Sequence, residues 1–272
     1  MYKISCFADE IASTLSEQLD VMEKLNVGWF SLRSIGDTSV LELTDEQIDE
    51  IARTIKARGV GVSSIGSPIG KTPITDTSDA YLRQTERAIQ IAEKLDCPRI
   101  RVFSFYMEKD ELDIYREEVI ERLGKIADLA AAAGIEIMHE NEAGIYGESS
   151  GRCRDLLEGV NRPNFKAVFD PSNFVAAGED PFDQSLPQVK KFVSYLHIKD
   201  SRHSDGVIVP AGEGDGQIRE ILQAFAGQDL FLTLEPHLSV AGRMKGFSGP
   251  ERFAKAYEAL TGLLKASGIA YR

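Results

Sequence analysis

Four short stretches in the second half of the sequence end an apolar run with side chains that can bind a cation. They are HEN (139–141), FDPSN (169–173), HIKD (197–200) and LEPH (234–237). Carboxylates held close together repel one another and raise each other's pKa unless a cation neutralises them. Three carboxylates with one imidazole are an oxygen-rich ligand set, which suits Mn²⁺, Mg²⁺, Co²⁺ or Fe²⁺ better than a thiolate-type zinc site. The stretches therefore suggest a divalent-metal centre, provided that the fold brings them together.

Strand-like and helix-like segments alternate along the whole chain. Amphipathic helices are predicted over 44–59, 78–96, 115–134 and 249–268, and the first of these has Thr44 at its N-cap and Gly59 at its end. Eight apolar segments are predicted to be strands, at 2–8, 28–35, 60–69, 98–106, 135–141, 166–173, 193–200 and 230–237. Eight such units in 272 residues predict an α/β fold, a single (β/α)8 TIM barrel over residues 1–272. An open doubly wound sheet is the rival, but CFADEIAS (6–13) lacks the glycine-rich turn that usually follows its first strand.

A barrel of this kind predicts where the chemistry lies, because its active sites form at the C-terminal ends of the strands. Side chains alternate between the two faces of a strand. If the four acidic or histidine side chains face inward, then Phe169, Leu196 and Leu234 face the helices, as apolar residues should. His139 then also faces the helices, where we expect a packed, hydrogen-bonded imidazole. The inward set, brought to one end of the barrel, is Glu140, Asp170, His197 and Glu235.

Composition and charge narrow the classes of partner. No apolar run approaches the roughly 18 residues that a membrane span needs, and the first residues, MYKISCFADE, lack the apolar region of a signal peptide. A net charge of −12 disfavours nucleic acid and anionic membranes as partners. The three cysteines are odd in number and include no CxxC, which argues against a disulfide scaffold and favours a reducing cytoplasm.

The motifs, taken together and in order, resemble the sugar phosphate isomerase/epimerase family of xylose-isomerase-like TIM barrels. They are SIGSPIGK (64–71), RVFSF (101–105), HENEAGIYG (139–147), FDPSNF (169–174), HIKD (197–200), VPAGEGDG (209–216) and LEPHL (234–238). The resemblance implies metal ligation by Glu140, Asp170, His197 and Glu235, with the two glutamates also exchanging protons with the substrate. The family covers ketose epimerases, isomerases, inosose dehydratases and lyases of oxidised sugars. Where the ketose epimerases have a histidine three residues past the aspartate, this chain has Asn173.

Further side chains are candidates for contact with a substrate. Lys199 lies on the same face as His197 and is expected to meet a substrate hydroxyl or oxyanion, with an ion pair to Asp200 or Glu213 as the alternative. Asp200 is expected to orient His197 or Lys199. The glycine-rich loop PAGEGDG (210–216) is expected to border the metal or the substrate, because its two acids would repel phosphate. The remaining candidates are His237, with a loop cap as its alternative role, Arg33, with a structural salt bridge, Lys71, with a surface loop, and Asn173.

The predicted function is a divalent-metal-dependent sugar or polyol isomerase or epimerase. It transfers a proton at a carbon next to a carbonyl, through an enediolate, with Glu140 and Glu235 as catalytic residues. The expected cofactor is Mn²⁺, with Mg²⁺, Co²⁺, Fe²⁺ or Zn²⁺ open, the expected substrate is a small carbohydrate, and a homo-oligomer stays open. A metal-dependent lyase or dehydratase acting on a keto-sugar or keto-inositol is the alternative.

Two other classes are less favoured. An endonuclease-type phosphodiesterase draws on many histidines for three zinc ions, and this chain has four histidines in all. A catalytically silent sugar-binding barrel would not need two glutamates at a metal.

Overall fold

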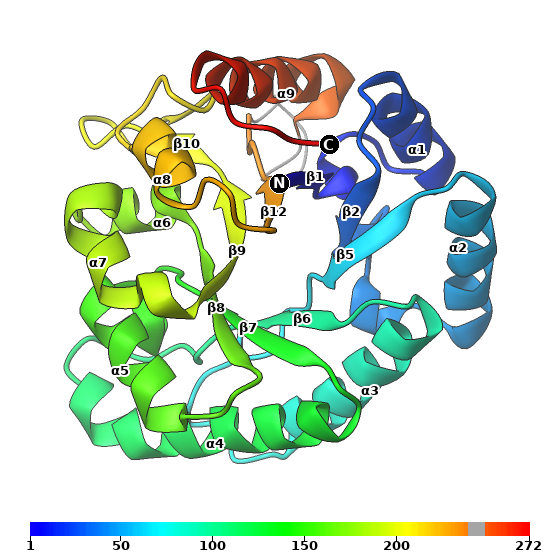
Figure 1. Ribbon diagram of the computed structural model, residues 1–272. Helices are drawn as coiled ribbons and strands as arrows, with labels where there is room; N and C mark the ends of the chain where they lie inside the picture. The colour runs from blue at the N-terminus through cyan, green and yellow to red at the C-terminus, as the bar shows by residue number, and fades with distance from the viewer. Residues whose placement is uncertain (239–247) are drawn as a thin grey trace.

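The structure is a computed structural model that describes residues 1–238 and 248–272. Eight parallel strands form a nearly closed barrel (Figure 1). Their order is β1-β12-β9-β8-β7-β6-β5-β2, and a bridge between Phe7 and Ser31 links the two end strands. The strands are β1 (Lys3–Cys6), β2 (Trp29–Leu32), β5 (Gly61–Ile65), β6 (Arg99–Val102), β7 (Glu136–Glu140), β8 (Phe165–Phe169), β9 (Val193–Ile198) and β12 (Phe231–Leu234). The predicted TIM barrel is confirmed.

Helices form an outer ring around this barrel (Figure 1). The α-helices are α1 (Leu15–Lys24), α2 (Asp45–Ala57), α3 (Ala80–Lys94), α4 (Leu112–Ala132), α5 (Ser150–Val160), α6 (Pro171–Ala176), α7 (Leu186–Val189), α8 (Ile218–Ala224) and α9 (Gly249–Ala266). Helix α2 starts as predicted, with a capping box between Thr44 and Gln47, and Gly59 beyond its end has a positive φ of 65°. Among the helices described, none is long and apolar enough to cross a membrane.

Short elements complete the connections between strands and helices. Two small antiparallel pairs, β3 (Ser34–Ile35) with β4 (Thr38–Ser39) and β10 (Asp200–Ser201) with β11 (Ile208–Val209), follow β2 and β9. The single-turn helices are η1 (Ala8–Glu10), η2 (Val40–Glu42), η3 (Tyr146–Glu148), η4 (Pro181–Ser185) and η5 (Lys190–Phe192). Element η1 directly follows β1, so it lies at the end of the barrel where active sites form.

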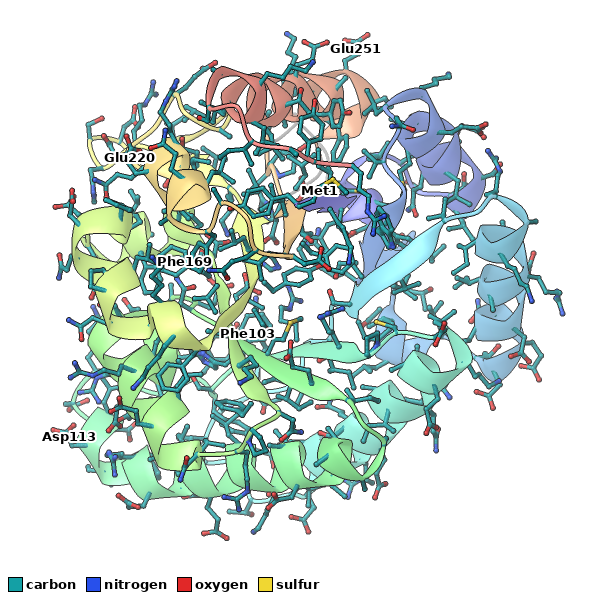
Figure 2. The ribbon with its side chains drawn as sticks, viewed as in Figure 1. Met1, Phe103, Asp113, Phe169, Glu220 and Glu251 are labelled. Atoms are coloured by element: carbon teal, nitrogen blue, oxygen red, sulfur yellow. The ribbon has the colours of Figure 1, made fainter. Side chains whose placement is uncertain are left out.

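Apolar side chains fill two layers. Phe169, Leu196 and Leu234 are buried in the large cluster between strands and helices, as the alternation of side chains predicts. A smaller cluster fills the barrel itself, formed by Met138, Val168, Tyr195 and Phe231. Figure 2 shows both layers filled, with the carboxylates Asp113, Glu220 and Glu251 projecting from the outer ring. The predicted orientation of the late strands, with Phe169, Leu196 and Leu234 facing the helices, is therefore confirmed.

Several predicted strands were too long at their C-terminal ends. The segments 60–69, 98–106 and 166–173 were expected to be strands, but β5 ends at Ile65, β6 at Val102 and β8 at Phe169. After β8, Asp170 caps a helix that begins at Pro171, because proline fixes a helical φ and loses no helical hydrogen bond at that position. Asn173 thus lies in the first turn of α6 and not at a strand end.

Candidate active site

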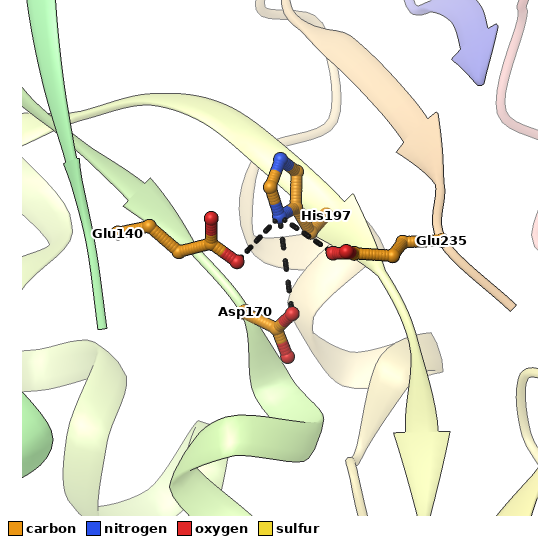
Figure 3. A group of neighbouring side chains, drawn as sticks. All are labelled: Glu140, Asp170, His197 and Glu235. Atoms are coloured by element: carbon orange, nitrogen blue, oxygen red, sulfur yellow. Dashed lines mark hydrogen bonds and ion pairs between the residues drawn. The ribbon is translucent and has the colours of Figure 1, made fainter. Parts of the chain in front are cut away.

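Four side chains from neighbouring strands converge at the C-terminal end of the barrel (Figure 3). Glu140 is the last residue of β7 and His197 lies in β9, while Asp170 and Glu235 directly follow β8 and β12. The Nδ1 atom of His197 is 2.9 Å from Glu140 Oε1, 3.1 Å from Glu235 Oε2 and 3.8 Å from Asp170 Oδ2. We call these four residues the ligand group, because one donor atom from each lies within 4.8 Å of the others.

The ligand group fits a divalent cation. Its members are only 0–4% exposed, and a buried carboxylate is costly unless positive charge or hydrogen bonds compensate it. Asp170 Oδ2 and Glu235 Oε2 face His197 Nδ1, yet neither receives a well-directed hydrogen bond from the described residues. Three carboxylate oxygens and one imidazole nitrogen are the donors that Mn²⁺, Fe²⁺ or Co²⁺ accept. Here the residues would ligate through His197 Nδ1.

In the absence of a metal ion, a proton on His197 supplies positive charge to the ligand group. Burial lowers the pKa of His197, but Glu140 and Glu235 outweigh that effect and raise it to about 9. Burial and the neighbouring glutamates raise the pKa of Asp170 to about 6, although Lys199 opposes them. Burial would raise the pKa of Glu140 as well, yet the positive charges nearby lower it to about 2. In the metal-free protein an imidazolium is therefore the central cation.

Each carboxylate of the ligand group also has a cation of its own. Arg101 Nη1 lies 3.1 Å from Glu140 Oε2, and Arg33 Nη1 lies 2.9 Å from Glu235 Oε1. Lys199 Nζ lies 2.8 Å from Asp170 Oδ2, the same oxygen that faces His197. Lys199 does not pair with Asp200 or Glu213, the partners considered from the sequence.

A cavity of about 610 Å³ opens above the ligand group, and its size is that of a typical small-molecule site. All five predicted substrate-contact residues line it, namely Arg33, Lys71, Asn173, Lys199 and His237. Each already has a protein partner. Lys71 Nζ is 2.9 Å from Glu142 Oε2, and Asn173 donates its side-chain amide to Asn141 O at 2.7 Å. His237 Nδ1 is 2.9 Å from Glu10 Oε1.

Asp170 is held in place from two directions. Its Oδ1 atom accepts the backbone N–H of Asn173 at 3.0 Å, as the N-cap of α6, which leaves Oδ2 facing the ligand group. Its backbone N–H donates to Asn141 Oδ1 at 3.0 Å, and its carbonyl accepts from Asn141 Nδ2 at the same distance. These bonds pre-organise the carboxylate, which is how supporting side chains tune metal ligands.

Two sequence-based expectations about neighbouring residues had different outcomes. His139 is buried behind the barrel wall and its Nε2 is 3.0 Å from Ser104 Oγ, as expected. The expected role of Asp200 was wrong. Its carboxylate turns away from His197 and Lys199 and accepts backbone N–H groups of the glycine-rich loop, at 2.8 Å from Gly212, 3.1 Å from Gly214 and 2.8 Å from Gly216. The reason is geometric, because three N–H groups bind a carboxylate better than one lysine that already has a partner.

Sequence reasoning included Arg33 but missed other residues that the early strands bring to the site. Arg101 is 5% exposed, and its Nη2 also donates to Gly66 O at 3.1 Å. The ring of Phe7 packs edge-on against His197 at 5.2 Å between centroids, and the ring of Phe103 lies 4.8 Å from the Arg101 guanidinium. The signal was present in RVFSF (101–105), where a charged residue stands in an otherwise apolar strand.

A family model described as a xylose isomerase-like TIM barrel matches residues 19–263, and the chain belongs to this family. A search of curated proteins found no significant match.

Solved structures share the fold at low sequence identity. The probable 3-DHS dehydratase AsbF from Bacillus anthracis superposes with a TM-score of 0.77 at 17% identity, over 95% of this chain and 98% of that chain. The IOLI protein, solved with a binding zinc atom, gives 0.78 at 15% identity, over 97% and 99%. A D-tagatose 3-epimerase-like protein gives 0.75 at 15% identity, over 98% of both chains. At these identities the likeness shows the fold alone.

Proposed function

We propose that this protein is a divalent-metal-dependent isomerase or epimerase of a sugar or polyol, acting by proton transfer at a carbon next to a carbonyl. The observation that carries the proposal is the placement of Glu140 and Glu235. They approach His197 Nδ1 from two sides, at 2.9 Å and 3.1 Å, with Asp170 between them (Figure 3). Two acid–base groups facing one position are what a proton removal and return require.

In this scheme the ligand group would hold the metal, with His197 neutral. A bound divalent cation supplies Lewis acidity, which makes a C–H next to a carbonyl more acidic. One glutamate, ionised, would remove that proton, and the other, protonated beforehand from solvent, would return its own proton to the opposite face of the carbon. Lys199, whose ammonium lines the cavity, would contact an oxygen of the bound substrate. Arg101 lies beside Glu140 and Arg33 beside Glu235, so each glutamate has a counter-charge when it is ionised.

A dehydratase or lyase is the second candidate, and the position of His237 favours it. Loss of a hydroxyl needs a general acid in addition to the base that removes the proton. Burial lowers the pKa of His237, but Glu10 and Glu235 outweigh that effect and raise it. Its Nε2 lies 3.9 Å from Glu235 Oε1, so the imidazole stands beside one of the proposed bases. The AsbF structure, named as a probable dehydratase, shows that this fold occurs in a protein of that title.

The test follows hydrogen exchange in D₂O. The Mn²⁺-loaded protein is incubated with ketoses, keto-inositols and 3-keto-glycosides, and NMR follows deuterium at the carbon next to the carbonyl. We expect exchange with the wild type and a loss of about 10²–10⁴-fold in Glu140→Gln and in Glu235→Gln. Glu136→Gln is the matched control, because Glu136 lies at the other end of the same strand as Glu140.

The outcomes separate the schemes. A product lighter by one water identifies the dehydratase. Product formation without solvent exchange, with hydrogen moving directly from carbon to carbon, would contradict the two-glutamate scheme and favour a hydride shift. We also propose Mn²⁺ as the native metal and a cytoplasmic location. The oxygen-rich ligand group supports the first, and three buried free cysteines support the second.

A further inference from the structure

The charges of the three carboxylates in the ligand group are largely compensated by neighbouring cations before any metal binds. Its three carboxylates meet three cations, Arg101, Lys199 and Arg33. Two further acids lie beside them. Glu10 pairs with His237, and this pair adds no net charge wherever its proton lies. Asp9 shares Arg33 with Glu235, its Oδ2 lying 2.8 Å from Arg33 Nε, and adds one negative charge. With His197 neutral, the cluster therefore carries one net negative charge.

A bound divalent cation would change the net charge of this cluster from negative to positive. It brings two positive charges to a cluster that holds one negative charge, so one positive charge is left over. Two further ion pairs at the cavity, Lys71 with Glu142 and Arg202 with Asp205, add no net charge, and the carboxylate of Asp200 is bound by three backbone N–H groups of its own loop. The loaded ligand group and its three cations would thus carry positive charge within a protein whose net charge is −12. A low-dielectric cavity with uncompensated positive charge selects an anion.

In the loop where a bound phosphate would be expected, the backbone N–H groups already donate to a carboxylate of the protein. Barrels of this class often bind phosphate beside the last two strands. The backbone N–H groups suited to that role, at Gly212, Gly214 and Gly216, point at the carboxylate of Asp200. The space is fully used, because a Cβ on Gly214 would lie 2.4 Å from Asp200 Oδ1. The surplus charge, in addition, is one unit, which matches a carboxylate better than a doubly charged phosphate.

Lys199 is the cation that would lose its carboxylate partner to a bound metal. Its Nζ lies 2.8 Å from Asp170 Oδ2 and 4.0 Å from Glu235 Oε2. Both oxygens face His197 Nδ1, so both would turn their charge to the metal. Arg101 and Arg33, by contrast, contact the other oxygens of their glutamates and keep them. Lys199 lines the cavity, so its ammonium is available to a bound molecule once the metal is in place.

Building on the proposed function, we infer that the substrate is an unphosphorylated sugar acid, a keto-sugar or polyol whose single carboxylate pairs with Lys199. The carboxylate is recognised by side-chain charge in the cavity, and the glycine-rich loop plays no part in binding it. Lys199 is then a specificity-determining residue for the reaction of the ligand group.

Three ketoses that differ only at C6 test this inference. D-Fructose carries a hydroxyl there, D-fructuronate a carboxylate and D-fructose 6-phosphate a phosphate. Titration calorimetry on the Mn²⁺-loaded protein gives their dissociation constants. We expect fructuronate to bind at least about tenfold more tightly than fructose, and fructose 6-phosphate no more tightly than fructose. In the metal-free protein the advantage of the acid should disappear.

Two lysine variants then locate the effect. Lys199→Met, or Lys199→Gln if the first does not fold, should bring the acid and the neutral sugar to within about threefold while Mn²⁺ stays bound. Lys166→Met is the matched control, because Lys166 lies near the start of β8, the strand that Asp170 follows, and is not among the residues that line the cavity. It should keep the preference for the acid.

The contrary results are distinct. Equal binding of fructose and fructuronate, tightest binding of the phosphate, or an unchanged preference in the Lys199 variants would overturn the inference. Solvent exchange on a neutral ketose with no preference for the acid would overturn it and leave the proposed function standing. Failure of the wild type to hold Mn²⁺ would remove the proposed function and the inference with it, whereas binding of none of the three ketoses would overturn the inference and leave the proposed function to the exchange test.

Discussion

The early and late strands of the barrel bring opposite charges to the same site. The late strands β7, β8, β9 and β12 carry the four residues of the ligand group at their ends. The early strands β2 and β6 supply the two arginines that neutralise the glutamates, Arg33 just beyond the end of β2 and Arg101 within β6. The comparison teaches that the other half of the barrel helps the two glutamates to stay ionised and buried, whereas Asp170 has Lys199 from its own half.

The largest effect should come from the early half. Arg101→Met removes one of the two cations beside the buried Glu140 and leaves only His197, and breaking one side of a buried ion pair costs about 3–5 kcal/mol. We expect the free energy of unfolding of the metal-free protein to fall by that amount in urea titrations, and added Mn²⁺ to restore part of it. Arg99→Met, two residues earlier on the same strand, removes a partly exposed cation whose nearest acid is 3.7 Å away, and should cost less than about 1 kcal/mol. Equal losses in both variants would contradict the early–late division of charge.

The next effect comes from the late half. Removal of supporting residues around a metal typically costs 10–100-fold in affinity, so loss of a ligand should cost about 100-fold or more. His197→Ala and Asp170→Ala are therefore expected to bind Mn²⁺ at least that much more weakly in equilibrium dialysis, with the fold retained by circular dichroism. His203→Ala lines the same cavity outside the ligand group and should bind as the wild type does. Unchanged Mn²⁺ affinity in the folded ligand variants would rule out this site.

The last expected effect is on the pH dependence of metal binding, which reports the proton that a bound metal displaces from His197. The pKa of His197 in the metal-free protein is raised from 6.5 to about 9 by Glu140 and Glu235, against the opposing effect of burial. That interaction stabilises the metal-free fold fully below pH 6.5, and its contribution is lost as the pH rises through 9. A divalent cation must displace this proton, so metal affinity should rise up to about tenfold per pH unit across that window.

Titration calorimetry at about pH 7.5 in buffers of different ionisation enthalpy measures the proton directly. We expect close to one proton released for each Mn²⁺ bound. Asp170, with a pKa raised to about 6, is already largely ionised at that pH and adds little. Release of no proton would mean that His197 is neutral without metal, and that the arginines alone compensate the glutamates.

The sequence predicts the late half of the site far better than the early half. Glu140, Asp170 and Glu235 each end an apolar strand, so residue type and position together identify them. Arg101 stands within a strand and acts through Glu140, 39 positions away, and no local pattern says which acid a given cation faces. The interaction is decided by the lateral order of the strands, in which β6 and β7 are neighbours.

The loops were the hardest part to predict. Asp200 follows His197 closely enough to suggest a shared task, yet its partners are the N–H groups of Gly212, Gly214 and Gly216. Such a contact depends on the path of the backbone between them, which strand periodicity does not encode. The ends of β5, β6 and β8 were overestimated for a similar reason, because apolar residues continue past the barrel edge into buried connections such as Ile69 and Phe105.

The double use of the Asp170 carboxylate has a consequence for how metal and carbohydrate binding affect each other. One oxygen caps α6 and the other faces the metal position, so a cation that immobilises Asp170 also immobilises the first turn of α6. That helix carries Asn173, Val175 and Ala176, which form one wall of the cavity. A bound cation would therefore hold this wall more rigidly. The carbohydrate should then bind more tightly to the metal-loaded protein, and the metal should leave more slowly whenever the carbohydrate is in place.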